Sequence, residues 1–121
     1  GGDGLDEITV TATTTVGVVD GAGVRIETID PADFGIDYAP LESIQVDDPE
    51  TSARYVLEVL QNKPGPRRDI VALNAAAGFV VGDKADDLKQ GYAMALERLA
   101  SGRPAELLDR LVEMTGERTG A

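Results

Sequence analysis

The sequence contains no cysteine, no histidine and no tryptophan, and aromatic residues make up only 4% of it. Without cysteine there is no disulfide framework and no thiolate chemistry. Without histidine the commonest general base and the commonest zinc ligand are both missing. Any chemistry must therefore rest on carboxylates, lysine, arginine, tyrosine, hydroxyl groups or a bound ion. Because aromatic residues are scarce, the core has to be built from aliphatic side chains. Hydrophobic residues make up 42% of the sequence, which is enough for a core.

Positive charge is also scarce, because 11 basic residues face 22 acidic ones and leave a net charge of −11. Such a surface repels nucleic acid and anionic lipid, so we expect no nucleic-acid partner and no membrane partner. No run of 18 apolar residues could span a membrane, and no basic segment precedes an apolar stretch as in a signal peptide. We expect one modest domain in the cytoplasm, since 121 residues suit that size.

A glycine-rich turn at residues 1–4 leads into two adjacent carboxylates, Asp6 and Glu7. On an extended chain these side chains would point to opposite faces, but on a turn they can converge on one hard cation. Magnesium usually takes one or two protein carboxylates and fills its other positions with water and phosphate oxygens. The pair is therefore either half of a Mg²⁺–phosphate site or a solvated acidic turn, and the residue types alone leave both readings open.

Residues 9–29 have the composition of β-structure. Threonine and valine dominate residues 9–19, which predicts a strand. Asp20 to Gly23 reads as a turn, and residues 24–29 alternate with a period of two. We expect a β-hairpin over residues 13–29, a turn over residues 30–35 and irregular chain from Ile36 to Val46.

Residues 48–115 are predicted to form four helices. Asp48 is expected to cap the first helix, with Pro49 as its first residue. The second, from Asp69 to Val81, is apolar enough to be buried on most sides. The third would be capped by Asp83, and its small residues Gly91 and Ala95 would allow close helix packing. It should end at Gly102.

The fourth helix is expected to begin at Pro104 and to turn one apolar face inward, and residues 115–121 would fray. The inward side chains would be Leu107, Leu108, Leu111 and Met114.

Two further polar features have mainly structural interpretations. Asn74 interrupts the apolar second helix, and a buried asparagine must find partners, so we expect it to bond to a neighbouring backbone. Arg67 and Arg68 at the start of that helix could meet a phosphate, but as a surface pair they would balance nearby acids.

The predicted fold class is α/β, a β-hairpin followed by four helices. Two strands cannot cover four helices, and the second helix is too apolar to keep an exposed side. The chain is therefore expected to be one piece of a larger domain or of an assembly.

Four motifs in order carry a resemblance to a known family. Residues 4–8 read G-L-D-E-I, residues 30–35 read D-P-A-D-F-G, residues 68–76 read R-D-I-V-A-L-N-A-A, and residues 91–102 have glycine–alanine–glycine spacing. The order resembles anthranilate phosphoribosyltransferase over about residues 2–115. The resemblance implies the C-terminal part of that enzyme's mixed-sheet α/β domain, with a fold like that of the class II nucleoside phosphorylases.

The resemblance implies a glycosyltransferase of tryptophan biosynthesis, an aromatic amino-acid pathway. Its reaction transfers the 5-phosphoribosyl group from phosphoribosyl pyrophosphate to anthranilate and uses Mg²⁺. In the family the D-E of G-L-D-E holds the metal, which carries over to Asp6 and Glu7. No residue of this chain is assigned a catalytic role by the resemblance. The family also implies a homodimer of the full enzyme.

The family's G-T-G-G-D phosphate loop, its K-H-G-N segment and its anthranilate-contacting arginine precede G-L-D-E and are not in this sequence. The isolated chain is therefore expected to be inactive and to need an upstream polypeptide of the same enzyme. A smaller departure is Gln45 to Asp48, where many members have G-G-D. Acceptor specificity lies outside the chain.

Three other readings remain open. A pyrimidine nucleoside phosphorylase shares the fold and a similar D-G-L-D-E motif, but it carries a further C-terminal domain. A nucleic-acid-binding relative of the same fold conflicts with the net charge of −11. A non-catalytic fragment that completes a partner's fold would hold no metal at Asp6 and Glu7.

Overall fold

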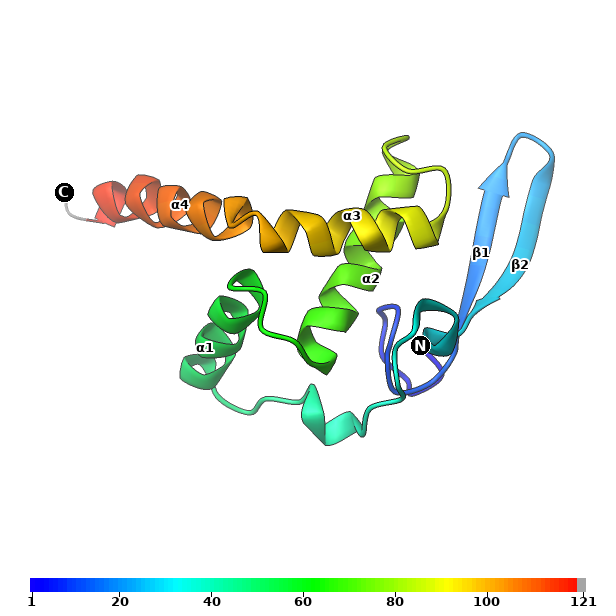
Figure 1. Ribbon diagram of the computed structural model, residues 1–121, viewed down its shortest axis with the longest axis horizontal. Helices are drawn as coiled ribbons and strands as arrows, with labels where there is room; N and C mark the ends of the chain where they lie inside the picture. The colour runs from blue at the N-terminus through cyan, green and yellow to red at the C-terminus, as the bar shows by residue number, and fades with distance from the viewer. Residues whose placement is uncertain (120–121) are drawn as a thin grey trace.

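The computed structural model describes residues 1–119 and shows a β-hairpin, two short 3-10 helices and four α-helices. Figure 1 shows an elongated arrangement, with the hairpin projecting at one end and the last helix at the other. The elements in chain order are β1 (Thr14–Asp20), β2 (Gly23–Ile29), η1 (Pro31–Phe34), η2 (Leu41–Ser43), α1 (Pro49–Leu60), α2 (Pro66–Val81), α3 (Leu88–Ala100) and α4 (Arg103–Thr119).

The hairpin is antiparallel and pairs Thr14 with Ile29 and Asp20 with Gly23. Its turn is stabilised by Asp20, whose Oδ1 accepts a hydrogen bond from the Ala22 amide at 2.8 Å. The prediction of a hairpin over residues 13–29 is confirmed to within one residue. The strand predicted to begin at Thr9 is wrong at its start, because residues 9–13 belong to a loop that side-chain hydrogen bonds hold together.

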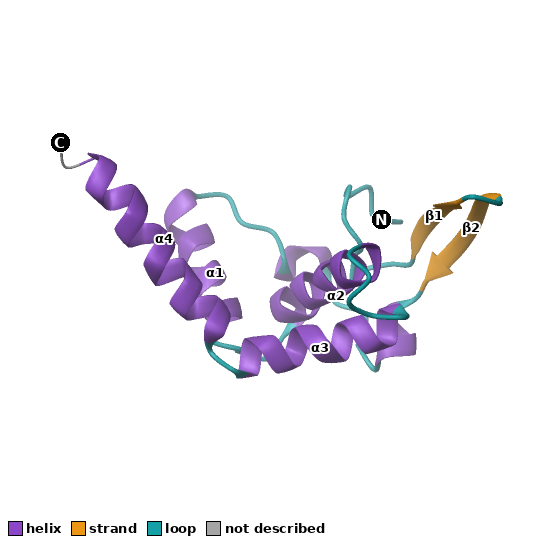
Figure 2. Ribbon diagram, turned by 90° about the horizontal axis from the view of Figure 1, so that it is seen from above, coloured by secondary structure: helices purple, strands orange, loops and turns teal. Residues whose placement is uncertain are grey.

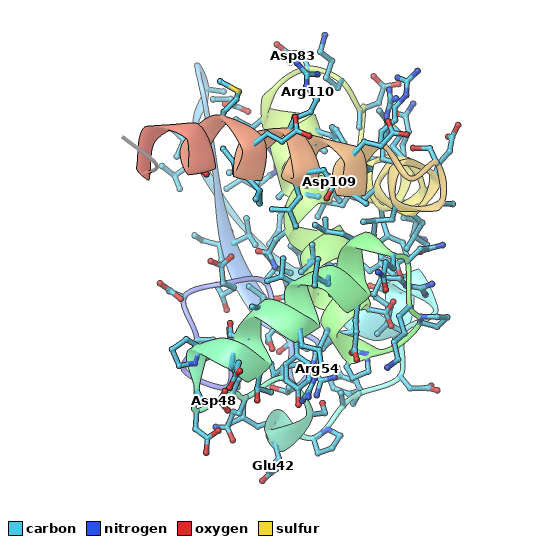
Figure 3. The ribbon with its side chains drawn as sticks, turned by 90° about the vertical axis from the view of Figure 1, so that its left-hand side faces the viewer. Glu42, Asp48, Arg54, Asp83, Asp109 and Arg110 are labelled. Atoms are coloured by element: carbon cyan, nitrogen blue, oxygen red, sulfur yellow. The ribbon has the colours of Figure 1, made fainter. Side chains whose placement is uncertain are left out.

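Local capping rules explain the start of α1. The Asp48 carboxylate accepts a hydrogen bond from the Thr51 amide at 2.7 Å, and Pro49 is the first helical residue, both as predicted. Figure 3 labels Asp48 beside the first turn of this helix. The bond to the Thr51 amide is also the main reason that the pKa of Asp48 lies below its usual value.

Two predicted helix starts need correction. α2 begins at Pro66 rather than at Asp69, because Pro66 already has a helical φ and follows Gly65, whose φ of +143° only glycine adopts readily. α3 is capped by Asp87, which accepts a hydrogen bond from the Gln90 amide at 2.8 Å. Asp83, the predicted cap, instead takes a left-handed φ of 57° in the turn that follows α2.

The main packing contact joins α2 to α3. A Cβ on Gly91 would lie 2.8 Å from the Ala76 carbonyl oxygen, so the predicted close approach at this glycine is confirmed. On α2, Leu73 forms a buried cluster with Val10 and Ile36. This cluster connects α2 to the chain on both sides of the hairpin, because Val10 precedes the hairpin and Ile36 follows it. Figure 2 shows α2 and α3 side by side, with the hairpin at one end of the helical body.

The predicted inward face of α4 is wrong for three of its four residues, since only Leu108 is half-buried. Leu107, Leu111 and Met114 are 63%, 55% and 67% exposed, and the helix continues to Thr119 rather than fraying from residue 115. α2 also keeps one exposed face, at Val71, Ala75 and Gly78, although it was predicted to be buried on most sides. Periodicity identifies an apolar face but not the surface that covers it. Residues 120 and 121 of the predicted tail lie outside the described part.

Within residues 1–119, every helix is too short or too polar to cross a membrane.

Candidate functional site

The predicted metal turn belongs to a closed loop of residues 1–13. The Gly2 amide donates a hydrogen bond to the Thr13 carbonyl at 2.8 Å, and a Cβ on Gly2 would lie 2.8 Å from that same oxygen. A tighter turn lies inside, where the Gly4 amide donates to the Gly1 carbonyl at 3.2 Å and Gly4 has a φ of +90°. Glycine is thus required at residue 2 for space and at residue 4 for backbone conformation.

Asp3 holds the inside of this loop. Its Oδ2 accepts hydrogen bonds from the Thr9 and Thr11 hydroxyls, each at 2.5 Å, and its Oδ1 accepts one from the Leu5 amide at 3.0 Å. The Thr11 and Thr9 hydroxyls lower the pKa of Asp3 from 3.8 to about 2, since their bonds favour the charged carboxylate. We name this arrangement of Asp3, Leu5, Thr9 and Thr11 the Asp3 clasp.

Sequence reasoning missed the Asp3 clasp, because Thr9 to Thr13 has the composition of a strand. The sequence signal that could have indicated the clasp is Asp3 followed by Thr9 and Thr11, two threonines that are two residues apart. Threonine hydroxyls compete with regular structure in this way when a carboxylate is within reach.

Asp6 and Glu7 are exposed on the segment between two members of the clasp, Leu5 and the buried Thr9. Among the described residues, neither side chain forms a hydrogen bond or an ion pair, in contrast with Asp3. The two carboxylates are therefore available to an external ligand, on a segment whose two ends are fixed by the surrounding loop.

Asn74 joins this segment to α2. Its Nδ2 donates to the carbonyls of Ile8 and Ile70, both at 2.8 Å, and its Oδ1 accepts from the Ile8 amide at 3.0 Å. The expectation that Asn74 bonds to neighbouring backbone is confirmed. Its partner Ile8 is 66 residues away in the sequence, directly after Glu7.

Both arginines at the start of α2, Arg67 and Arg68, contact side chains of nearby residues. Arg68 contacts Asp69 at 3.2 Å, while Arg67 stacks 3.4 Å from the centre of the Tyr55 ring and lies 3.8 Å from Glu58. The prediction that the pair balances nearby acids is confirmed, but both side chains are half-buried rather than on the surface.

Asp69 also links α2 to α3, because its Oδ1 accepts a hydrogen bond from the Tyr92 hydroxyl at 3.3 Å. Burial, reinforced by the charge of Asp69, raises the pKa of Tyr92 to about 12.

The turn fits a partial magnesium site. Asp6 and Glu7 offer hard oxygen donors without internal partners, and Mg²⁺ commonly binds through one or two carboxylates together with water and phosphate oxygens. Among the side chains that the structure describes, no three acidic ones are grouped closely enough to hold a metal by themselves. The donors suit a metal that is shared with a phosphate ligand, rather than one enclosed by this chain alone.

Comparison with known proteins decides the family. The family model described as "Glycosyl transferase family, a/b domain" matches residues 1–105. The chain belongs to this family. The match includes the Asp3 clasp, the carboxylate pair, the hairpin and helices α1 to α3.

The most similar proteins include two bacterial anthranilate phosphoribosyltransferases. The one from Xylella fastidiosa is 42% identical over 115 residues, which cover 95% of this chain and 33% of that protein. The one from Nitrosomonas europaea is 42% identical over 117 residues, which cover 97% of this chain and 34% of that protein. The chain thus spans about a third of the length of the curated relatives it matches.

Solved structures give the same result for the fold. Anthranilate phosphoribosyltransferase from Thermus thermophilus superposes with a TM-score of 0.81 at 38% identity, covering 92% of this chain and 33% of that chain. The enzyme from Saccharomyces cerevisiae, solved in complex with 4-fluoroanthranilate, gives a TM-score of 0.84 at 25% identity, covering 97% and 34%. The predicted resemblance and the predicted piece of an α/β domain are confirmed.

Proposed function

We propose that this chain forms the C-terminal part of the catalytic α/β domain of an anthranilate phosphoribosyltransferase. That enzyme would transfer the 5-phosphoribosyl group from phosphoribosyl pyrophosphate to the amino group of anthranilate, a step of tryptophan biosynthesis. The observation that carries the proposal is the 42% identity to proteins of that name over 95% of the chain. The exposed carboxylates of Asp6 and Glu7, which have no partner among the described residues, add chemical support, because they could bind the Mg²⁺ that this reaction uses.

In this proposal Asp6 and Glu7 bind Mg²⁺ together with the diphosphate of the substrate. The bound metal would neutralise and orient the pyrophosphate leaving group. The chain's own contribution is positional. The Asp3 clasp and the bonds between Ile8 and Asn74 hold the backbone on either side of the two carboxylates, so that they need little ordering when the ligand arrives.

The proposal also implies partners. The relatives are about three times as long as the match, so the phosphate-binding and anthranilate-binding residues would come from upstream polypeptide of the same enzyme. We further propose a cytoplasmic homodimer for the complete enzyme. The chain by itself would be inactive, because it holds only one side of the substrate site.

The first experiment replaces Asp6 or Glu7 with alanine in an enzyme of the relatives' full length that carries this segment. Each variant should lower Mg²⁺-dependent turnover by at least about 10-fold, since a metal ligand matters no less than the groups that orient it. The thermal midpoint should stay close to that of the unaltered enzyme, because both side chains are exposed and without internal partners.

Asp109→Ala provides the matched control, because Asp109 is an exposed carboxylate on α4, labelled in Figure 3. It should leave both turnover and its Mg²⁺ dependence unchanged. Equal turnover in the Asp6, Glu7 and Asp109 variants would overturn the metal assignment. It would favour the reading of this segment as a structural piece of the domain.

A further inference from the structure

We infer that Asn74 is a positioning residue that sets the geometry of the Asp6–Glu7 turn from within α2. The inference rests on the proposed function, because it assigns the two carboxylates a ligand. It adds a residue far away in the sequence to the machinery of that site. Asn74 itself would touch neither the metal nor the substrate.

The contact is made to both polar groups of one residue. The Asn74 side chain accepts a hydrogen bond from the Ile8 amide at 3.0 Å and donates one to the Ile8 carbonyl at 2.8 Å. It therefore makes the same pair of backbone hydrogen bonds that a neighbouring β-strand would make. The orientation of the amide is defined, because a flipped side chain would place its NH₂ against the Ile8 amide and its oxygen against two carbonyls.

The contact between Asn74 and Ile8 matters for the site because Ile8 directly follows Glu7. The Ile8 amide belongs to the peptide bond that Glu7 begins, so the Asn74 bonds restrict the backbone directly after the second carboxylate. Of the hydrogen bonds made by residues 1–8 within the described chain, the others run to residues of the same 1–13 loop. Asn74 is thus the hydrogen-bonded connection between the carboxylate turn and the helical body.

The helix makes this connection rigid. The second Nδ2 hydrogen bonds to the Ile70 carbonyl at 2.8 Å, one turn earlier in α2. The adjacent Leu73 is only 1% exposed and packs against Val10 and Ile36. With both ends of the amide held by backbone, the side chain has no freedom to follow a moving turn.

The test measures order in the turn separately from global stability. In the 121-residue chain, Asn74→Ala should lower the hydrogen-exchange protection of the Ile8 amide by about 10-fold more than it lowers that of the α2–α3 core. Leu99→Ala is the matched destabilising control, because Leu99 is buried at 7% exposure in α3 and its loss should weaken all regions alike.

Mn²⁺ with pyrophosphate serves as the second probe, read by paramagnetic broadening of the Asp6 and Glu7 amides. Asn74→Ala should need several-fold more Mn²⁺ for equal broadening, whereas Leu99→Ala should match the unaltered chain. If neither the unaltered chain nor an enzyme of the relatives' full length that carries this segment shows broadening, the metal assignment fails, while the exchange data still decide the positioning role.

The inference is overturned if the Ile8 amide and the core lose protection in the same proportion in both variants. If Asn74→Ala does not fold, hydrogen exchange in the unaltered chain tests the inference instead. Its Ile8 amide should exchange together with the α2 amides as denaturant is added. Exchange of Ile8 as fast as that of the Asp6 amide, which forms no hydrogen bond within the described residues, would contradict the inference.

Discussion

At the scale of single residues, Asp3 shows how a carboxylate can serve the backbone instead of a ligand. Three donors converge on it, and they come from both sides of the Asp6–Glu7 pair. The same loop therefore contains one acid that is used internally and two that are free to bind. Hydrogen bonding, rather than residue type, separates these roles.

The lowered pKa of Asp3 predicts an acid-dependent loss of stability. Since its folded pKa of about 2 lies below the ordinary value of 3.8, the charged carboxylate stabilises the fold above pH 3.8, and this contribution is lost as the pH falls towards 2. The difference in unfolding free energy between the unaltered chain and Asp3→Asn should therefore shrink over that range. Urea unfolding at a series of pH values measures it.

Thr11→Val is the companion variant, because it removes the donor that contributes most to the lowered pKa of Asp3. In that background the pH dependence of the Asp3→Asn difference should weaken. A difference that stays constant with pH would show that the Asp3 clasp does not form in solution.

At the scale of elements, the crossing of α2 and α3 depends on a glycine that faces backbone. A Cβ at Gly91 would lie 2.8 Å from the Ala76 oxygen and 3.0 Å from the Ala76 Cα, and neither atom can move without moving α2. Ala76 lies two residues after Asn74, so the contact with α3 and the hydrogen bonds to Ile8 are made from the same part of α2.

Gly91→Ala should destabilise the chain by about 1–3 kcal/mol, the usual effect of overpacking. Gly78→Ala is the matched control on α2, where an added Cβ meets nothing within 4 Å. Since alanine favours a helix over glycine, this control should gain about 0.5–1 kcal/mol. Chemical unfolding compares the two, and equal stability of both variants would contradict the close packing at Gly91.

At the scale of the whole molecule, apolar surface remains uncovered at both ends of the helical body. One groove between the hairpin and the ends of α2 and α3 is lined by apolar side chains that include Val16, Val18, Val80 and Val81. The apolar face of α4 adds Leu107 and Leu111. Exposed patches of this kind promote association.

The chain in isolation should therefore self-associate as its concentration rises, despite its net charge of −11. Val81→Lys combined with Leu107→Lys should reduce the average mass at high concentration without lowering the thermal midpoint, because both side chains are more than half exposed. Sedimentation velocity across a concentration series measures the mass. A chain that stays monomeric throughout would contradict the prediction.

Features that depend on neighbours along the chain could be predicted from the sequence. The Asp48 cap, the turn at Asp20 and the left-handed Gly102 two residues after the end of α3 follow from one or two residues and their backbone preferences. The ordered motifs likewise led to the family before any contact was known. These features are local, so a short window of sequence is enough to predict them.

Only the tertiary structure determined which groups the polar and apolar side chains contact, because these contacts join distant parts of the fold. Thr9 and Thr11 became part of a clasp rather than of a strand, because the Asp3 carboxylate competes with ladder hydrogen bonds. Asn74 found its partner at Ile8, 66 residues away, which no pattern within α2 could indicate. Leu107 and Leu111 of α4 stayed exposed, because periodicity defines a face while the covering surface depends on the rest of the fold.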